Sequence, residues 1–540
     1  MREMRRVLVL SCVVAGCTGQ GSLDLQLSLP TAPELRPTGM TTVEVLATSP
    51  NIEPIANRSV LNGSFFSAGE LPVADDVQLS VLLHDVSNRL VGLGEAPALV
   101  DIVGDKATTV SIPVRRPFIY ASSGTTLYTF DPTLDPRDGK FQGKLDGLTT
   151  PQVAVSVGGD RLVVGGQSTL QVIDTATHKV TGGPIAMPGG GMIKDVAPVP
   201  GANIVAVAHT GGIAIVNLAD GSVQNAEVGP VDRIAVGQAP DKRMVAYGLV
   251  GRVAPADSQL SACGGSSSIV AVFVDAPAAT APKPLPMGAS AIAAAPSQAA
   301  VFATIPCQGH VVKIEGDPTS EVATLTFTMM SMLPNASTIA VLGDRVFAAG
   351  TRGSSPVCAT ASGNVTQCTT TTQVACPEPN ATHLSYVTAG ARLVVQSIPV
   401  GGGNPVELQL PEERETMIST DDPAEQHAQV LHPLSSVPLD LVALPGGQYV
   451  SLVTKNSYYI ESLSDGFTVL LPCLKVTTGN WYLIDMASSS VAQRVRPSCD
   501  LVYGMNAYFR MWKCDNAPEG QRPTLGEFMP VGVGALFGAR

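Results

Sequence analysis

The chain has 540 residues, which is long enough for more than one domain with a core of its own. Only 14% of the residues are charged, and a net charge of −12 excludes the basic surface on which nucleic-acid binding depends. Plentiful glycine and proline, with 5% aromatic residues, favour many short buried strands over long amphipathic helices. The sequence therefore predicts an all-β protein with no nucleic-acid partner.

Residues 1–16 have the order of a secretory signal peptide. Three arginines among the first six residues precede an apolar run over residues 7–14, which is too short for a bilayer that needs about 20 apolar residues. Two small residues then precede Cys17. This arrangement resembles the lipobox of bacterial lipoproteins, in which the cysteine is lipidated and becomes the mature N-terminus.

The resemblance implies a diacylglycerol thioether on Cys17 and an acylated amino group. Two or three acyl chains, such as palmitate, form a stable membrane anchor, whereas one chain is marginal. Residues 17–22 would then be a short linker at the membrane. Thr18, in place of an aspartate, favours the outer membrane, on its periplasmic or surface face. The alternative is an ordinary secretory signal that happens to contain a cysteine.

Eight cysteines remain beyond residue 17, and an even number in an exported chain favours disulfides. They are Cys263, Cys307, Cys358, Cys368, Cys376, Cys473, Cys499 and Cys514. No CxxC motif supports a redox pair or a zinc ribbon. We expect the pairs Cys263–Cys307 and Cys473–Cys499. Two of the three cysteines within 358–376 can pair with each other, which leaves the third to pair with Cys514. A metal cluster of these three is the alternative, although no histidine accompanies them at ligand spacing.

Residues 23–115 are interpreted as a small antiparallel β-sandwich. The segments 23–29, 77–83 and 110–114 alternate apolar and polar residues, which is the period of half-buried strands. Turn residues separate them from shorter apolar runs, so six or seven strands are expected. Four aspartates could bind calcium, although solvated turn carboxylates are the more ordinary interpretation. These are Asp75, Asp76, Asp85 and Asp101.

Residues 117–540 contain a repeat typical of β-propeller blades. The third apolar run of successive units ends at Asp131, Asp174 and Asn217, which are 43 residues apart. Counting the units favours a ring of seven blades, with six or eight as alternatives. The repeats resemble the YVTN and quinoprotein amine dehydrogenase-like propeller superfamily, most clearly over residues 172–180. A WD40 propeller is disfavoured because no Gly-His pair is followed by a Trp-Asp pair in the sequence.

The first unit begins at residue 118 with a run that fits the second strand of a blade better than the first. We therefore expect a C-terminal segment, residues 529–536, to supply the missing strand and close the ring.

Two long insertions interrupt the repeats, at residues 250–268 and 353–437. Both carry cysteines, and long propeller loops often bind partners. The second insertion contains a strongly acidic stretch, residues 412–432, that also holds His427 and His432. A cation site or a partner-facing loop is one interpretation of this stretch, and a solvated insertion is the other.

The sequence contains no recognisable catalytic constellation. It lacks the GxSxG, SxxK, P-loop and HExxH motifs. His178 lies in a predicted turn and His209 at a predicted strand end, where solvated or core-edge roles are usual. No cofactor is expected.

The leading hypothesis is therefore a lipid-anchored, non-enzymatic binding or scaffold propeller with an unknown protein or glycan partner. The alternative is a lactonase-like or dehydrogenase-like propeller enzyme acting on an extracytoplasmic small molecule. A third class is a structural subunit of an envelope assembly.

The anchor hypothesis is tested by Cys17→Ala, which should move the protein from the membrane fraction to the soluble fraction and abolish acyl labelling. Cys12→Ala, within the leader, is the matched control and should leave both unchanged. Acyl labelling that persists in Cys17→Ala would refute the assignment.

Overall fold

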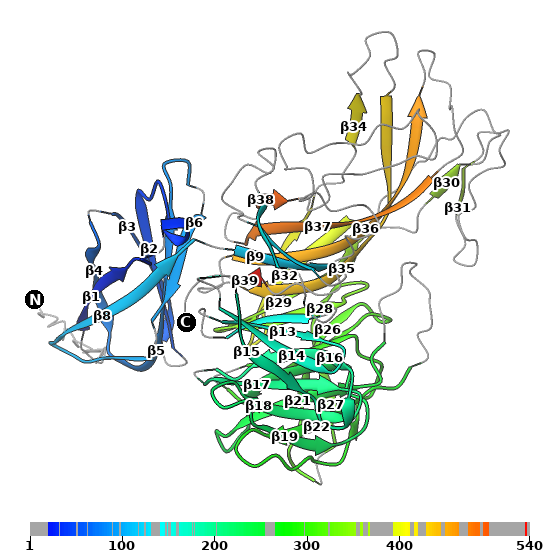
Figure 1. The fold of residues 1–540 in the computed structure, drawn as a ribbon, viewed down its shortest axis with the longest axis horizontal. Coiled ribbons are helices and arrows are strands. Elements are labelled where there is room, and N and C mark those ends of the chain that lie inside the picture. Colours follow the sequence, from blue (N-terminus) through cyan, green and yellow to red (C-terminus); the bar gives the residue numbers. More distant parts are fainter. Residues whose placement is uncertain are drawn as a thin grey trace, which may run out of the picture.

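The computed structural model describes residues 20–495 with gaps, together with residues 535–536 (Figure 1). The longest gaps are residues 131–140, 254–264, 368–391, 419–427 and 464–473. Figure 1 shows the N-terminal strands as a separate body beside a group of stacked sheets. No helix in the described part of the chain has the length and apolar character needed to cross a bilayer.

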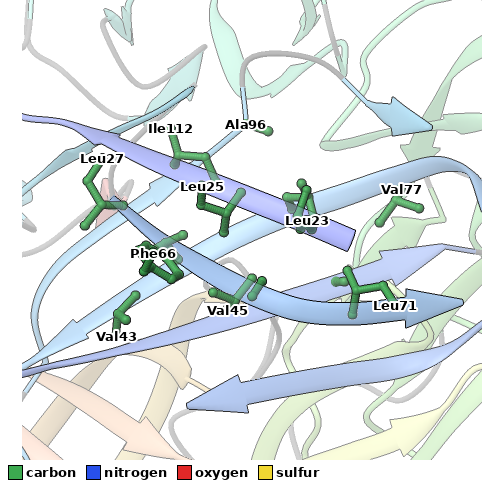
Figure 2. Close-up of a cluster of buried hydrophobic side chains, with 14 of the residues drawn as sticks. Leu23, Leu25, Leu27, Val43, Val45, Phe66, Leu71, Val77, Ala96 and Ile112 are labelled. Atoms are coloured by element: carbon green, nitrogen blue, oxygen red, sulfur yellow. The ribbon is translucent and has the colours of Figure 1, made fainter. Parts of the chain in front are cut away.

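The N-terminal domain contains eight strands that form one folded-over sheet with the order β3-β2-β5-β6-β8-β1-β4, in which β7 pairs with β5. Their bounds are β1 Gln20–Ser28, β2 Thr42–Ser49, β3 Ile52–Val60, β4 Phe65–Pro72, β5 Ala74–His84, β6 Leu90–Glu95, β7 Val100–Ile102 and β8 Ala107–Arg115. The predicted alternation decides which side faces inward: Leu23, Leu25 and Leu27 of β1 are all buried. Figure 2 shows these leucines packed with Phe66 and Ile112 in one core.

The expectation of a purely antiparallel domain is wrong at one pair of strands. The first and last strands, β1 and β8, are parallel and stay in register from Ser22 opposite Ala107 to Ser28 opposite Pro113. Two strands that the sequence pattern missed, β4 and β7, lie in this domain as well. A parallel neighbour requires a long connection, and here that connection is the rest of the domain.

In the part of the chain that the structure describes, seven sheets of four or five strands follow, besides one two-stranded hairpin. The first three consist of β9 Phe118–Ser123, β10 Thr126–Phe130, β11 Phe141–Leu145 and β39 Ala535–Leu536; β12 Val153–Val157, β13 Arg161–Gly166, β14 Thr169–Asp174 and β15 Lys179–Ala186; and β16 Ile193–Pro198, β17 Ile204–His209, β18 Gly212–Asn217 and β19 Val223–Glu227.

The next two sheets consist of β20 Arg233–Gln238, β21 Met244–Val250, β22 Ser268–Phe273 and β23 Lys283–Pro284; and β24 Ala291–Ala294, β25 Val301–Ile305, β26 His310–Glu315 and β27 Thr326–Met332. The last two consist of β28 Thr338–Leu342, β29 Arg345–Arg352, β32 Arg392–Pro399 and β33 Val406–Gln409; and β34 Glu415–Ile418, β35 Ala428–Ala443, β36 Tyr449–Leu463, β37 Leu474–Asp485 and β38 Ser490–Val495.

The sheets are arranged as propeller blades. We call β12, β16, β20, β24, β28 and β35 the first strands, and each of them contacts the next one along the chain. Buried apolar clusters fill the space between neighbouring sheets, so both faces of the inner strands are covered. The β-propeller architecture is therefore confirmed, while the number of blades in a closed ring stays a prediction.

The polar residue that marks the end of the third strand has a structural role in two of the sheets. The Oδ1 atom of Asp174 accepts a hydrogen bond of 2.7 Å from the Thr177 N–H, and Oδ1 of Asn217 accepts one of 2.9 Å from the Ala219 N–H. Such side-chain bonds stabilise the turn into the fourth strand, which explains why aspartate and asparagine recur there.

The predicted insertion at residues 353–437 is wrong in its extent. Strands β32 and β33 complete the β28 sheet, and β34 and β35 already belong to the next sheet. The interruption therefore lies between Arg352 and Arg392, which pair with each other. It contains the two-stranded hairpin of β30 Val357–Ala359 and β31 Val365–Gln367. The insertion predicted at 250–268 agrees with the connection between β21 and β22, of which residues 254–264 lie outside the described residues.

The expected contribution of the C-terminal segment to the first unit is confirmed. Ala535 pairs with Ile119 and Leu536 with Phe118, so β39 lies at the edge of β9 where a first strand belongs. It also contacts β12, the first strand of the following sheet. Residues 529–534 of the predicted segment lie outside the described residues.

Deleting residues 525–540 should lower the thermal unfolding midpoint by at least about 2 °C, because the β9 sheet loses its first strand and the ring loses its closure. Calorimetry of the intact chain checks this. Deleting only residues 537–540, which leaves β39 in place, is the control, and an unchanged midpoint in the longer deletion would contradict the closure.

Candidate functional site

A carboxylate joins two neighbouring first strands. Asp195 follows an irregularity in β16 and reaches β20, where its Oδ2 accepts a hydrogen bond of 3.0 Å from the Ile234 N–H. Its Oδ1 accepts a second, also 3.0 Å, from the Val196 N–H. The Nη1 atom of Arg233 lies 3.9 Å from that oxygen. Asp195 therefore holds two sheets together through backbone donors.

Burial and neighbouring charges have opposing effects on the pKa values of Asp195 and Arg252. Burial raises the pKa of Asp195, although Arg233, the two backbone N–H groups and Arg252 all act to lower it. Burial lowers the pKa of Arg252 to about 10, with the charge of Arg233 acting in the same direction and Asp195 and Asp232 opposing it. Arg252 is therefore still protonated at neutral pH.

Arg252 continues the connection to the next sheet. Its backbone N–H donates to Oδ2 of Asp232 at 2.9 Å, and its side-chain Nε donates to the carbonyl oxygen of Ser290 at 2.8 Å. Since Asp232 precedes β20 and Ser290 precedes β24, the guanidinium ties the β20 sheet to the β24 sheet. A hydrogen bond to a charged donor is stronger than one between neutral groups.

Two buried serines extend these links around the ring. The Ser290 hydroxyl donates to the Ala336 carbonyl at 2.8 Å and, with its hydrogen used there, accepts from Oγ1 of Thr304 at 2.7 Å. The Ser337 hydroxyl donates to the Pro438 carbonyl at 2.8 Å. We call Asp195, Arg252, Ser290 and Ser337 the inter-sheet belt, which connects five successive sheets from β16 to β35.

The chemistry of the inter-sheet belt is structural. Its side chains are directed at backbone groups of the neighbouring sheet, so their donors and acceptors hold the ring together. Among the residues that the structure describes, no group of three or more His, Cys, Asp or Glu side chains is placed to hold a metal ion. The inter-sheet belt therefore fixes the positions of neighbouring sheets relative to one another.

Sequence reasoning missed the belt residues. The available signal was positional: the belt residues Ser290 and Ser337, and Asp232, which accepts the Arg252 N–H, each immediately precede or adjoin the apolar run of a first strand. Their partners cannot be found from such a signal, because the Ser290 hydroxyl bonds a carbonyl 46 residues away.

His209 is a core histidine. Its ring is fully buried, with Nδ1 accepting from the Gly211 N–H at 3.1 Å and Nε2 placed 2.9 Å from Oδ1 of Asn225. This network assigns the proton to Nε2, since Nδ1 is an acceptor. A Cβ atom on Gly191 would lie 2.2 Å from Nδ1, so glycine is required beside the ring. His178 lies outside the described residues.

The predicted cysteine sites are mostly outside the described residues. Those not described are Cys17, Cys263, Cys368, Cys376, Cys473, Cys499 and Cys514. Cys358 lies in β30, and Cys307, in the turn between β25 and β26, is disulfide-bonded. The pairing of Cys307 with Cys263, and of Cys473 with Cys499, stays a prediction.

Three of the four aspartates considered for calcium lie on paired strands, because Ala74 pairs with Ile102 and Val77 with Val100, which places Asp101 opposite Asp75 and Asp76. Asp75 lies near the start of β5, whereas Asp85 follows its end and accepts a 2.8 Å hydrogen bond from the Ser87 N–H in a turn. Asp101 lies on β7. In the acidic stretch, Glu415 and His432 lie on β34 and β35, while Asp421, Asp422, Glu425 and His427 are outside the described residues.

The chain matches no protein-family model and no curated protein sequence. Solved structures similar to it include hydrazine synthase from Kuenenia stuttgartiensis, with 15% identity, a TM-score of 0.36 and coverage of 66% of this chain and 99% of that one. The Cps50 (Swd1) β-propeller domain of Myceliophteria thermophila has 12% identity, a TM-score of 0.32 and coverage of 63% and 95%.

A functionally unknown protein from Desulfotomaculum acetoxidans has 9% identity, a TM-score of 0.38 and coverage of 66% and 95%. At these values, the three likenesses support no functional inference.

Replacing Ser290 by alanine should lower the free energy of unfolding by about 1–3 kcal/mol, because Thr304 and the Ala336 carbonyl lose buried partners. Denaturant unfolding followed by intrinsic fluorescence measures the change. Ser222→Ala, at an exposed turn, is the control and should stay within about 0.5 kcal/mol of wild type. Equal stability of both variants would show that the belt does not stabilise the ring.

Proposed function

We propose that the protein is a lipid-anchored component of the bacterial cell envelope, on the outer membrane, whose propeller of seven blades is a non-enzymatic binding scaffold. The observation that carries this proposal is the length of the strands in the last sheet. Strands β35 and β36 have 16 and 15 residues, whereas β17 and β18 of a regular sheet have six each.

The extra length forms an arm, which consists of residues 428–438 of β35, 454–463 of β36 and 474–480 of β37. Only Trp481–Asp485 of β37 pairs with β38, so this end of the sheet has the dimensions of the other blades. Beyond it, β36 stays paired with β35 and β37 from Thr454 to Ile460 and continues to Leu463 against β35. At about 3.3 Å per residue this part of β36 adds roughly 30 Å. Figure 1 shows β34 and the far ends of β35 and β36 extending beyond the stacked sheets.

An arm of paired strands suits recognition. Its backbone is paired on both sides of β36 from Thr454 to Ile460, with register shifts at Pro433/Ser435 and Pro438/Asp440 on the β35 side, so little conformational entropy is lost when a partner binds. A regular blade needs no such extension for its own core, because the ring part of the sheet already packs against the β28 sheet. A protein or glycan partner is the proposed ligand class.

The N-terminal domain suits the role of a spacer. Because β1 and β8 are parallel, the chain enters β1 at one end of the domain and leaves β8 at the other. Strand β8 has nine residues, which correspond to roughly 30 Å. Cys17 is three residues before β1 in the sequence, so an anchor there would attach to the end of the domain at which β1 begins, and β8 would lead from the other end to the propeller.

The test is to shorten the arm. Replacing residues 457–477 by an Asn-Gly turn, together with Cys499→Ser because its expected partner Cys473 is removed, joins β36 to β37 where Asn456 pairs with Thr478 and leaves the ring part of the sheet unchanged. Cross-linked pull-down from native membranes should recover a partner with the wild-type chain and lose it with the shortened one.

The deletion of residues 537–540 serves as the control and should keep the partner. Recovery of the same partners by a folded, shortened chain would overturn the role of the arm.

A further inference from the structure

Two methionines and a histidine meet on one face of the edge strand β27. In the pairing of β27 with β26, Met332 lies directly opposite His310 and Met329 lies opposite Val312. His310 and Val312 are two residues apart on β26, so they share a face. Directly opposite residues have Cβ atoms about 4.5–5.5 Å apart, close enough for a thioether and an imidazole to hold one ion.

A β-bulge makes this arrangement possible. In a regular strand, residues three apart point to opposite faces, so Met329 and Met332 would be separated by the sheet. The register shifts between Val311 and Val312, which leaves Met330 as the extra residue. Met330 and Ser331 turn the other way: Met330 packs against the core cluster of Val311, and Ser331 is buried.

The two thioethers are exposed on a fixed backbone. The residues Met329 and Met332 are 56% and 58% exposed. The Met332 carbonyl accepts hydrogen bonds from Nε2 of the buried Gln396 at 3.0 Å and from Nη2 of Arg352 at 3.1 Å. The Leu333 N–H donates to the Gly309 carbonyl at 2.6 Å, next to His310. The backbone is therefore set in place while the sulfur atoms remain accessible.

The neighbouring blade leaves this face open. Val312 packs in the cluster between the β24 and β20 sheets, so the face of β27 that carries Met329 looks toward the β20 sheet. The outer strand of that sheet, β23, has only two residues. An outer strand of ordinary length would extend further along the face on which the two methionines lie.

We propose that Met329, Met332 and His310 form a binding site for a soft monovalent metal ion, Cu(I). Thioether sulfur selects Cu(I) among the biological metals, and imidazole is a copper ligand as well. The set contains no carboxylate, which disfavours calcium and magnesium, and no thiolate, because Cys307 nearby is disulfide-bonded. This inference is independent of the binding arm and of the membrane anchor.

The test uses Ag(I), a soft monovalent ion of the same charge that does not undergo redox chemistry under these conditions. The intact chain is labelled with 13C in the methionine methyl groups, kept oxidised, and titrated. At one equivalent of Ag(I), the methyl resonances of Met329 and Met332 should shift together and saturate. Met192, which is 44% exposed and has its sulfur 3.7 Å from Nζ of Lys194, should not shift.

Three variants complete the test. The pair Met329→Leu and Met332→Leu should lose the tightly bound equivalent, measured by competition with a Cu(I) chelator. His310→Gln should weaken the affinity roughly tenfold or more. Met192→Leu should bind as wild type does. Equal, unsaturated shifts of all exposed methionines, or wild-type binding by the folded double variant, would overturn the site.

Discussion

The close approach of neighbouring first strands is the constraint on which the rest of the propeller depends. At Gly237 of β20, even a Cβ atom would lie 2.5 Å from Cβ of Ala294, the last residue of β24, and 2.8 Å from the carbonyl oxygen of Ala295, which follows it. Sheets packed this closely need small side chains and polar groups that bond the next sheet's backbone. Hence the inner strands are rich in alanine and valine, and the inter-sheet belt uses side chains directed at backbone groups.

The same constraint decides what could be predicted from the sequence. Short apolar runs and the turn-forming Asp174 and Asn217 recur because each blade meets the same packing problem, so the repeat was visible. The strand at Ala535 could be anticipated because residue 118 begins in a second strand. The boundary of the insertion could not, since the pairing of Arg352 with Arg392 is a matter of register across a long connection. The parallel pairing of β1 with β8 could not be predicted either, because it too joins strands that are far apart in the sequence.

The candidate sites were harder to predict than the fold. Ser290 and Ala336 are unremarkable in the sequence and meet only because two sheets adjoin. Met329 and Met332 have a spacing that a regular strand would place on opposite faces, and only the bulge at Val311 reverses that. Hydrophobic periodicity describes one strand at a time, whereas these contacts depend on how two strands align.

The parallel pairing of β1 with β8 also has a mechanical consequence. A force that separates the N-terminus from the propeller pulls β1 at Gln20 and β8 at Arg115, at opposite ends of the paired strands. The seven residue pairs from Ser22 to Ser28 are then loaded in shear, so their evenly spaced hydrogen bonds resist together instead of opening one after another. Tension along the chain would therefore meet its strongest resistance in the N-terminal domain where the two strands run side by side.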